Sequence, residues 1–323
     1  CSNLLFISQK IKFLYFALFS NSLLNLVKRK IILERKGIIL AGGRGTRLYP
    51  VTEAVSKQLI PVFDKPMIYY PLSVLFLSGI REIAVISTPQ HIPIFKELLG
   101  DGSRFGAHFE YIVQPSPDGL AQAYILAEQF LNGAASALIL GDNIFFGHQL
   151  PKMLINANSE EARCTVFCSQ VSDPERFGII EIGQGNQIIS IEEKPKLPKS
   201  NFAITGLYFL DHNAVEISKS VEPSLRGEYE ITNVLQHYVA EKKLDANLLK
   251  RGFAWFDTGT HSSLLRASNF IETMQTQQGL MVACLEEIAF NNGWVTTDAL
   301  HMAAKKYSKS NYGVYLESLL SAV

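Results

Sequence analysis

The sequence predicts an α/β protein with a Rossmann-like, mostly parallel sheet that is flanked by helices. Three observations lead to this prediction. Between residues 36 and 145, short apolar runs of strand length alternate with longer apolar runs of helix length. Successive strand-like runs follow in the middle of the chain, which predicts a smaller antiparallel part. From His261 to the C-terminus the pattern is mostly helical, which predicts a helical tail.

In the first half of the chain, glycines and one asparagine-glycine pair separate the predicted elements. Strands are predicted over residues 37–41, 83–87, 109–113 and 137–140, and helices over residues 66–78, 92–99 and 120–131. Gly79, Gly100 and Asn132-Gly133 follow the three helices, and such residues commonly end helices. Strands that alternate with helices imply a parallel sheet that is covered on both faces.

The middle of the chain contains four strand-like runs, at residues 164–170, 179–182, 188–191 and 203–210. The tetrapeptide Gly183-Gln184-Gly185-Asn186 is typical of a hairpin turn. We therefore expect antiparallel strands that form one wall of a pocket. The main domain, residues 36–323, then has three parts, at about residues 36–145, 146–260 and 261–323.

Residues 1–35 precede this pattern and are interpreted as an N-terminal extension. Their apolar run, residues 11–20, is too short to span a membrane. The basic cluster Lys28-Arg29-Lys30 follows that run, whereas a secretory signal has its positive charges before it. A poorly ordered extension and a helix packed on the surface both remain open, with a targeting peptide as a third interpretation.

Composition excludes some classes of function. The 323 residues include 30 basic and 30 acidic side chains, so the net charge is zero and gives no sign of a nucleic-acid partner. The four cysteines form no Cys-x-x-Cys pair, which favours free thiols in a reducing compartment. We expect a cytoplasmic protein without a membrane partner.

A glycine-rich segment after the first predicted strand is the strongest single motif. It runs Leu40-Ala41-Gly42-Gly43-Arg44-Gly45-Thr46-Arg47-Leu48-Tyr49-Pro50. The glycines let backbone amides approach a polyphosphate, and a guanidinium can donate paired hydrogen bonds to phosphate oxygens. A P-loop would need Gly-Lys-Ser/Thr, which is missing. A dinucleotide fingerprint would need a third glycine where Leu48 stands, although Asp64 lies where its ribose acid would be. An ordinary tight turn is the third alternative.

Seven segments in order resemble the sugar-phosphate nucleotidyltransferase family, and within it the glucose 1-phosphate thymidylyltransferases. The resemblance covers about residues 36–315. The segments that carry it are the glycine motif and residues 56–62 (SKQLIPV), 113–123 (VQPSPDGLAQA), 140–143 (LGDN), 173–178 (DPERFG), 192–195 (EEKP) and 255–261 (WFDTGTH).

The resemblance implies a role for each matching residue. It assigns Arg47, Lys57 and Lys194 to catalysis by positioning and charge neutralisation. It assigns the nucleotide to Leu40, Ala41, Gly42, Gly43, Gly45, Thr46, Arg47, Lys57, Gln114, Gly119 and Asp142, and the sugar phosphate to Asn143, Gly178, Glu193, Lys194 and Arg226. Taken alone, Lys57 would be interpreted as a surface charge, and for Arg226 a surface charge before a helix would be as good an interpretation as a site residue.

The resemblance also implies Mg²⁺ held by Asp142 and Asp257. Asp142 ends an apolar run, and a carboxylate at the carboxyl end of a parallel strand faces the ligand crevice. Mg²⁺ prefers oxygen ligands and often takes only one or two carboxylates. Capping of the following helix remains an alternative for Asp257, because Thr258-Gly259-Thr260 comes next.

The function that the resemblance implies is the reaction of dTTP with glucose 1-phosphate to give dTDP-glucose and pyrophosphate. It further implies a homotetramer in the dTDP-rhamnose pathway, with dTDP-rhamnose as feedback inhibitor at a second site near Gly147, His148, Arg251, Glu287 and Ile288. Three alternatives stay open: the same chemistry with UTP or another sugar 1-phosphate, a non-catalytic binding protein, and a nicotinamide-linked oxidoreductase.

Three residues depart from the family pattern. Arg44 stands where a small residue is frequent, Asn233 where Asp is usual, and Phe177 where Tyr is common. None of these changes removes a charged group that the resemblance assigns to the site.

Overall fold

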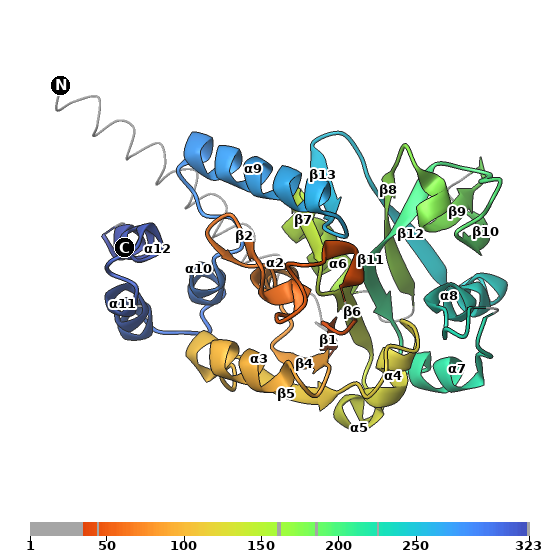
Figure 1. The fold of residues 1–323 in the computed structure, drawn as a ribbon, viewed down its shortest axis with the longest axis horizontal. Coiled ribbons are helices and arrows are strands. Elements are labelled where there is room, and N and C mark those ends of the chain that lie inside the picture. Colours follow the sequence, from red (N-terminus) through yellow and green to blue (C-terminus); the bar gives the residue numbers. More distant parts are fainter. Residues whose placement is uncertain (1–34, 44, 160–162, 185–186, 225, 322–323) are drawn as a thin grey trace.

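The computed structural model describes residues 35–43, 45–159, 163–184, 187–224 and 226–321. It has an α/β fold with helices on both sides of a central sheet, which confirms the predicted fold class (Figure 1). The central sheet has the strand order β10-β9-β11-β6-β1-β4-β5, and β8 joins β12 to β11. Its strands are β1 (Lys36–Leu40), β4 (Glu82–Ser87), β5 (His108–Val113), β6 (Ser136–Leu140), β8 (Cys164–Gln170), β9 (Gly178–Ile182), β10 (Ile188–Glu193), β11 (Phe202–Leu210) and β12 (Leu244–Leu249).

Two small sheets and the helices complete the fold. The small sheets pair β2 (Pro61–Val62) with β3 (Lys65–Pro66) and β7 (Asn143–Gly147) with β13 (Phe253–Asp257). The helices are α2 (Tyr69–Leu77), α3 (Ile92–Leu99), α4 (Gln122–Leu126), α5 (Glu128–Leu131), α6 (Leu150–Ser159), α7 (Ala214–Ser220), α8 (Ile231–Ala240), α9 (His261–Gln278), α10 (Leu285–Asn291), α11 (Thr297–Lys306) and α12 (Asn311–Leu320).

The core lies on both faces of the sheet, because successive residues of a strand point to opposite faces. Ile38 of β1 packs with residues of α4, α5, α7 and α8. Its neighbour Ile39 packs with residues of α2, α3, α6 and α10. Both isoleucines are fully buried, which explains why strand β1 is apolar along its length instead of alternating.

Most predicted elements of the first half are confirmed, with two corrections. The predicted helix at residues 66–78 begins at Tyr69, because Lys65–Pro66 pairs with Pro61–Val62 in a hairpin. The predicted helix at residues 120–131 is two short helices that meet at Ala127. Strands β1, β4, β5 and β6 are mutually parallel, as the alternation of strands and helices predicts.

The second half contains the four predicted strands and three that the sequence analysis missed. Strands β8, β9, β10 and β11 form antiparallel pairs, and Gly183 closes the β9–β10 turn through a bond from its amide to the Gln187 carbonyl. Gly185 and Asn186 of the predicted turn lie outside the described residues. Strands β7, β12 and β13 were not predicted, and β12 runs parallel to β8.

The described chain begins with Arg35, which is buried in the fold. Its guanidinium donates hydrogen bonds to the Ser136 and Leu210 carbonyls, at 2.8 and 2.6 Å. Residues 1–34 lie outside the described residues, so the alternatives for the N-terminal extension stay open. None of the described helices combines the length and the apolarity that crossing a membrane requires.

The C-terminal helices enclose two buried carboxyl groups of α10. Glu286 accepts a hydrogen bond from Tyr312 of α12, and Glu287 accepts one from Tyr315 of the same helix, at 2.9 Å. Burial raises the pKa of Glu287 to about 7, and the Tyr315 hydrogen bond only partly opposes this. Burial therefore leaves Glu287 partly protonated near neutral pH, against the hydrogen bond from Tyr315.

Glu287→Gln is expected to flatten the pH dependence of stability. Between the ordinary carboxyl pKa and about 7, the folded chain binds a proton that the unfolded chain has released. This raised pKa stabilises the fold at low pH, and the stabilisation is lost as pH rises toward 7. Urea unfolding should show the variant gaining roughly 1 to 3 kcal/mol relative to wild type between pH 5 and pH 8. Glu272→Gln, at an exposed position on α9, should show no such gain; parallel curves for wild type and Glu287→Gln would contradict the assignment.

Candidate active site

The glycine motif forms a loop at the carboxyl end of β1, in which two glycines cannot be replaced without strain. A Cβ atom on Gly42 would lie 1.9 Å from Gln114 Oε1, and Gly43 has a φ of 97°. Arg44 lies outside the described residues. Beneath the loop is a cavity of about 260 Å³. Its lining comprises Gly42, Gly43, Gly45, Thr46, Arg47, Leu48, Lys57, Gln58, Asp142 and Gly259.

Lys57 and Asp142 form an ion pair at the floor of this cavity. Lys57 is only 7% exposed, and its Nζ lies 2.5 Å from Asp142 Oδ2. The Asn143 amide donates a hydrogen bond to the other oxygen, Asp142 Oδ1, at 2.9 Å. Burial alone would raise the pKa of Asp142, but the Lys57 charge and these two hydrogen bonds hold it below its ordinary value. Asp142 is therefore a half-buried carboxylate that stays ionised.

Asp257 lies close to Asp142, because strand β13 pairs with β7 and places Asp257 opposite Asn143. Burial and the charge of Asp142 raise the pKa of Asp257, against the opposing charges of Lys57, Arg47 and Arg176. The cap of helix α9 is Thr260, whose Oγ1 accepts a hydrogen bond from the Ser263 amide. The capping interpretation of Asp257 is therefore wrong.

The donor set at this point fits Mg²⁺. Two carboxylates that repel each other at the edge of a cavity are suitable ligands for a hard divalent cation, which completes its shell with phosphate oxygens and water. Across the described ranges of the chain, no cluster of three or more His, Cys, Asp or Glu side chains could hold a metal. The carboxylates are neutralised instead by Lys57 and by Arg176, whose guanidinium lies 3.5 Å from Asp257 Oδ2.

Asn143 fixes the position of Asp142 and of the neighbouring strands. Its Oδ1 accepts hydrogen bonds from Trp255 Nε1, at 2.6 Å, and from the Gly206 amide of β11, at 3.1 Å. The Trp255 ring also makes an edge contact with Phe177, with 5.4 Å between ring centroids. One amide side chain therefore joins β7, β11 and β13 next to the candidate metal ligands.

Gln114 and Gly119 lie beside the glycine loop, at the end of β5 and in the turn before α4. Gln114 Nε2 donates a hydrogen bond to Gln122 Oε1 at 2.8 Å. Gly119 has a φ of 116°, and a Cβ there would lie 2.5 Å from the Tyr229 backbone. Leu40 is the last residue of β1, and Ala41 follows it.

The predicted sugar-phosphate residues form a second group. Gly178 of β9 is paired with Glu193 of β10. Glu193 Oε1 lies 3.4 Å from Lys194 Nζ and 3.5 Å from the Arg226 guanidinium, and burial raises its pKa. Arg226 also pairs with Glu230 at 2.7 Å. Arg226 is therefore fixed among carboxylates and is not a freely solvated charge.

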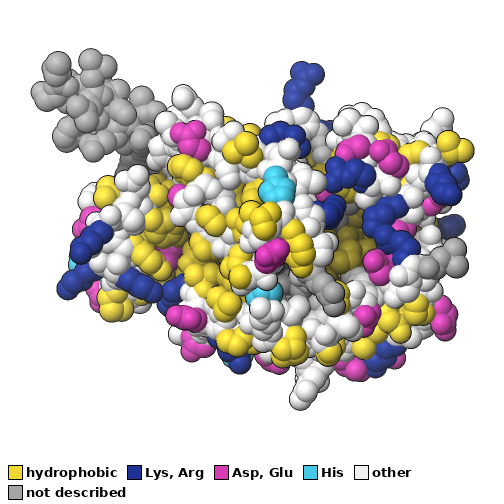
Figure 2. Space-filling view, in the orientation of Figure 1, with side chains coloured by type: hydrophobic (Ala, Val, Ile, Leu, Met, Phe, Trp, Pro, Cys, Tyr) yellow, Lys and Arg dark blue, Asp and Glu magenta, His cyan; other side chains and the backbone are white. Residues whose placement is uncertain are grey.

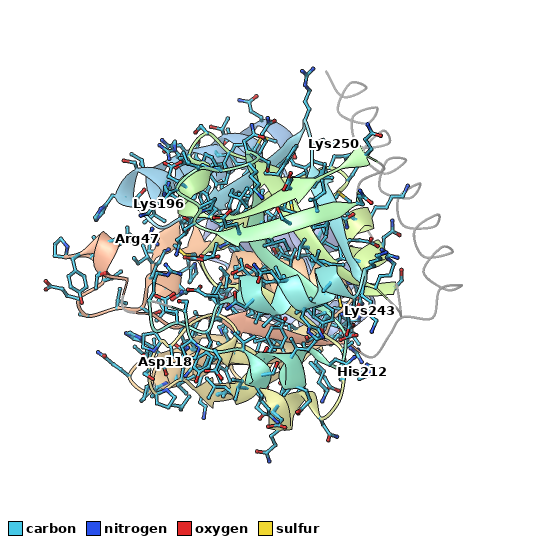
Figure 3. The ribbon with its side chains drawn as sticks, turned by 90° about the vertical axis from the view of Figure 1, so that its right-hand side faces the viewer. Arg47, Asp118, Lys196, His212, Lys243 and Lys250 are labelled. Carbon is cyan, nitrogen blue, oxygen red and sulfur yellow. The ribbon has the colours of Figure 1, made fainter. Side chains whose placement is uncertain are left out.

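The two groups are neighbours across strand β11. The carboxylates of Glu193 and Asp142, together with burial, raise the pKa of Tyr208, a fully enclosed residue of that strand. On this face of the molecule, Lys and Arg side chains gather over β8–β10, beside a hollow in the surface (Figure 2). Turned by 90°, the molecule shows Arg47, Asp118 and Lys196 along one edge and His212, Lys243 and Lys250 along the opposite edge (Figure 3).

The five residues predicted for a second, regulatory site lie on different elements. Gly147 ends β7, where it is paired with Phe253, His148 follows it, and Arg251 lies in the turn before β13. Glu287 contacts Tyr315, and Ile288 packs against the core from α10. These contacts do not test a regulatory role.

Arg176 and Trp255 were not singled out from the sequence, although both lie inside motifs that carry the resemblance. Arg176 is held by Asp173 at 2.5 Å as well as by Asp257. The signal that could have found them was their position: each motif also contains a residue that was assigned to the site, Gly178 or Asp257.

A comparison with known proteins agrees with this geometry. The sequence model described as "Nucleotidyl transferase" matches residues 36–274. The chain belongs to this family of enzymes. The glucose-1-phosphate thymidylyltransferase of Neisseria meningitidis serogroup A is 54% identical over 285 residues, which cover 88% of this chain and 99% of the relative. That of Mycobacterium tuberculosis is 47% identical over 285 residues, with the same coverage of 88% and 99%.

Solved structures agree with the fold. A protein from Bacillus anthracis described as a glucose-1-phosphate thymidylyltransferase, in complex with a sucrose, is 42% identical with a TM-score of 0.67, covering 73% of this chain and 94% of its own. A UDP-glucose pyrophosphorylase complexed with UDP-glucose is 24% identical with a TM-score of 0.66, covering 74% and 99%. The second likeness concerns the fold alone.

Asn143→Ala is expected to destabilise the nucleotidyltransferase by about 2 to 4 kcal/mol, because Trp255 Nε1 and the Gly206 amide would lose their shared acceptor. Urea unfolding followed by circular dichroism measures the change. Asn247→Ala on the half-buried strand β12 is the matched control and should cost much less. Equal losses in the two variants would show that Asn143 does not hold these strands together.

Proposed function

We propose that this enzyme transfers the thymidylyl group of dTTP to α-D-glucose 1-phosphate, giving dTDP-glucose and pyrophosphate with the help of Mg²⁺. The observation that carries the proposal is the buried Lys57–Asp142 pair beneath the glycine loop, with Arg47 and Asp257 beside it. A buried cation and two carboxylates around one cavity suit a polyphosphate with its metal. The names of the relatives support the choice of dTTP and glucose 1-phosphate.

The triphosphate carries several negative charges, which repel an incoming phosphate nucleophile. In the proposed complex, amides of the glycine loop and the Arg47 fork hold the outer phosphates, and the Lys57 ammonium turns from Asp142 toward the nucleotide. Asp142 and Asp257 would hold Mg²⁺, which supplies further neutralisation of phosphate charge. Gln114 can both donate and accept hydrogen bonds, which suits the edge of a thymine or uracil base.

The sugar phosphate would bind in the group around Glu193. Lys194 and Arg226 supply positive charge for its phosphate, and Glu193 can accept hydrogen bonds from sugar hydroxyls. A phosphate oxygen of the sugar then attacks the α-phosphorus of dTTP while pyrophosphate leaves. A phosphate monoester is already largely ionised near neutral pH, so positioning and charge neutralisation carry the catalysis and no covalent enzyme intermediate is needed.

The resemblance extends the proposal to the setting of the enzyme. We propose a cytoplasmic homotetramer that catalyses the first step of dTDP-rhamnose or related deoxysugar synthesis. Feedback inhibition by dTDP-rhamnose at a site near Arg251 and Glu287 belongs to the same proposal.

Pyrophosphate release from the purified protein tests the substrates. With glucose 1-phosphate and Mg²⁺, release should be fastest with dTTP when dTTP, UTP, CTP, ATP and GTP are compared. Faster release with another nucleotide would support nucleotidyl transfer but would show that dTTP is not the preferred substrate. A folded protein that releases no pyrophosphate with any of these nucleotides, or with other sugar 1-phosphates, would favour a non-catalytic binding protein.

Asp142→Ala and Asp257→Ala should each lower turnover by about 10²-fold or more, because Mg²⁺ would lose a ligand. In addition, Lys57 would lose its partner in the first variant and Arg176 in the second. Turnover is measured at saturating Mg²⁺, and circular dichroism verifies that each variant is folded. Asp245→Ala, a surface carboxylate paired with Arg163, is the matched control and should keep its turnover. Near-normal turnover in both site variants would overturn the metal assignment.

A further inference from the structure

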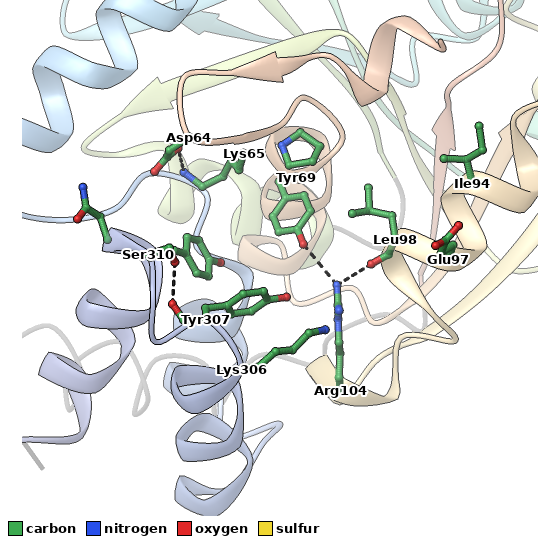
Figure 4. A pocket seen from close by; sticks show the side chains of 13 residues that line it. Asp64, Lys65, Tyr69, Ile94, Glu97, Leu98, Arg104, Lys306, Tyr307 and Ser310 are labelled. Carbon is green, nitrogen blue, oxygen red and sulfur yellow. Dashed lines mark hydrogen bonds and ion pairs between the residues drawn. The ribbon is translucent and has the colours of Figure 1, made fainter. Parts of the chain in front are cut away.

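A larger cavity, of about 840 Å³, lies between the helices α2 and α3 and the C-terminal helices (Figure 4). None of its lining residues belongs to the candidate active site. The lining comprises Asp64, Lys65, Pro66, Tyr69, Ile94, Glu97, Leu98, Arg104, Lys306, Tyr307, Ser310, Asn311 and Tyr312. Its volume lies within the range of about 300 to 1,000 Å³ that is usual for small-molecule sites.

Two cations of this cavity, Arg104 and Lys306, make no direct ion pair, although the charges of both act on the buried carboxyl of Glu286. The deeply buried Lys65 ammonium is paired with Asp64 at 2.5 Å, so its charge is compensated. Across the described parts of the chain, no carboxylate oxygen comes within 4.0 Å of the charged nitrogens of Arg104 or Lys306. Figure 4 shows these two side chains directed toward the same part of the cavity.

Arg104 also has hydrogen-bonding capacity to spare. One terminal nitrogen donates to the Leu98 carbonyl at 2.9 Å and more weakly to Tyr69 Oη at 3.4 Å. Its Nε is buried and has no acceptor among the described residues. The fork of a guanidinium matches two oxygens of a phosphate.

The beginning of helix α12 adds to the positive potential. Ser310 caps this ten-residue helix, and its Oγ accepts a hydrogen bond from the Gly313 amide. Ser310, Asn311 and Tyr312 all line the cavity, so the first turn of the helix faces it. Amides of a first turn have no partner inside the helix and favour an anion. Arg104, Lys306 and the first turn of α12 therefore all favour the binding of an anion.

The remaining walls are apolar or aromatic except for the carboxylate of Glu97, which lies beside Leu98 on α3. Tyr69 and Tyr307 offer ring surfaces to the cavity, close to Arg104 in Figure 4, and Ile94, Leu98 and Pro66 add aliphatic surface. A free phosphate ion would fill only a small part of about 840 Å³ and would leave these walls in water. A ligand with both an anionic end and a flat ring uses the whole lining.

We propose that this cavity binds the phosphate monoester of a ring compound, with the phosphate on Arg104 and Lys306 and the ring between Tyr69 and Tyr307. The site is separate from the candidate active site, and the proposal does not rest on the proposed function. Binding and turnover can therefore be measured independently of each other.

Isothermal titration of the full chain with phenyl phosphate tests the proposal, with inorganic phosphate and benzoate as comparison ligands. Phenyl phosphate should bind about tenfold or more tightly than either, because only it offers both a dianion and a ring. Arg104→Gln and Lys306→Gln should each weaken its binding by about tenfold. Lys305→Gln is the matched control: it removes the same charge from the same helix at an exposed residue outside the cavity and should leave binding unchanged. Arg47→Gln, at an exposed residue of the smaller cavity, should also leave binding unchanged.

Four outcomes would overturn the proposal. If wild type did not bind phenyl phosphate, the proposed site would not exist. If inorganic phosphate bound with equal affinity, the ring would make no contribution to binding. Weakening by Lys305→Gln as large as by Lys306→Gln would indicate a diffuse effect of surface charge. Weakening by Arg47→Gln without weakening by Lys306→Gln would place the ligand in the active site. Lys306 is exposed, so its variant remains informative even if Arg104→Gln fails to fold.

Discussion

The candidate active site depends on the buried ion pair between Lys57 and Asp142. Each partner is largely removed from water, so either charge alone would be strongly destabilising at that position. The pair joins the turn after the glycine loop to the turn between β6 and β7, and Asn143 then extends the contact to β11 and β13. The ion pair and the Asn143 hydrogen bonds together join four segments that are far apart in the sequence. Without a ligand, the site neutralises itself; with one, Lys57 must exchange a carboxylate for a phosphate.

The charges of Asp142 and Asp257 determine what is needed when Lys57 exchanges Asp142 for a phosphate. Asp142 keeps its charge because Lys57 compensates it, and this charge, together with burial, raises the pKa of Asp257. The arrangement therefore lacks positive charge once Lys57 turns to a nucleotide, and a divalent cation would restore the balance. Arg176, whose guanidinium lies 3.5 Å from Asp257 Oδ2, holds part of that balance and would have to yield its position to the cation. Arg176 thereby has a role that its place in the sequence did not suggest.

Much of the fold could be predicted because strands that are buried on both faces are continuous apolar runs, as β1 and β6 are. Strand β12 was missed because Asp245 and Asn247 interrupt its apolar pattern, and β13 because it pairs with only one other strand. In the site, spacing could not have paired Asp142 with Asp257, and the family resemblance supplied that pairing. The contact between Lys57 and Asp142, 85 residues apart, was not predicted and appears only in the folded chain. The larger cavity had no counterpart in any motif, since its lining comes from four short stretches whose proximity only the folded chain creates.

The two cavities share one stretch of chain. Lys57 contributes to the smaller cavity and Lys65 to the larger one, and the β2–β3 hairpin lies between them. The amides of Met67 and Ile68 bind back to the carbonyls of Ile60 and Gln58, which ties the end of the hairpin to the turn that carries Lys57. Thr258 Oγ1, next to Asp257, lies 3.3 Å from Met67 Sδ and 2.8 Å from the Asp142 carbonyl. A ligand that displaced Lys65 or Pro66 in the larger cavity would therefore act on the backbone that positions both Lys57 and Asp142.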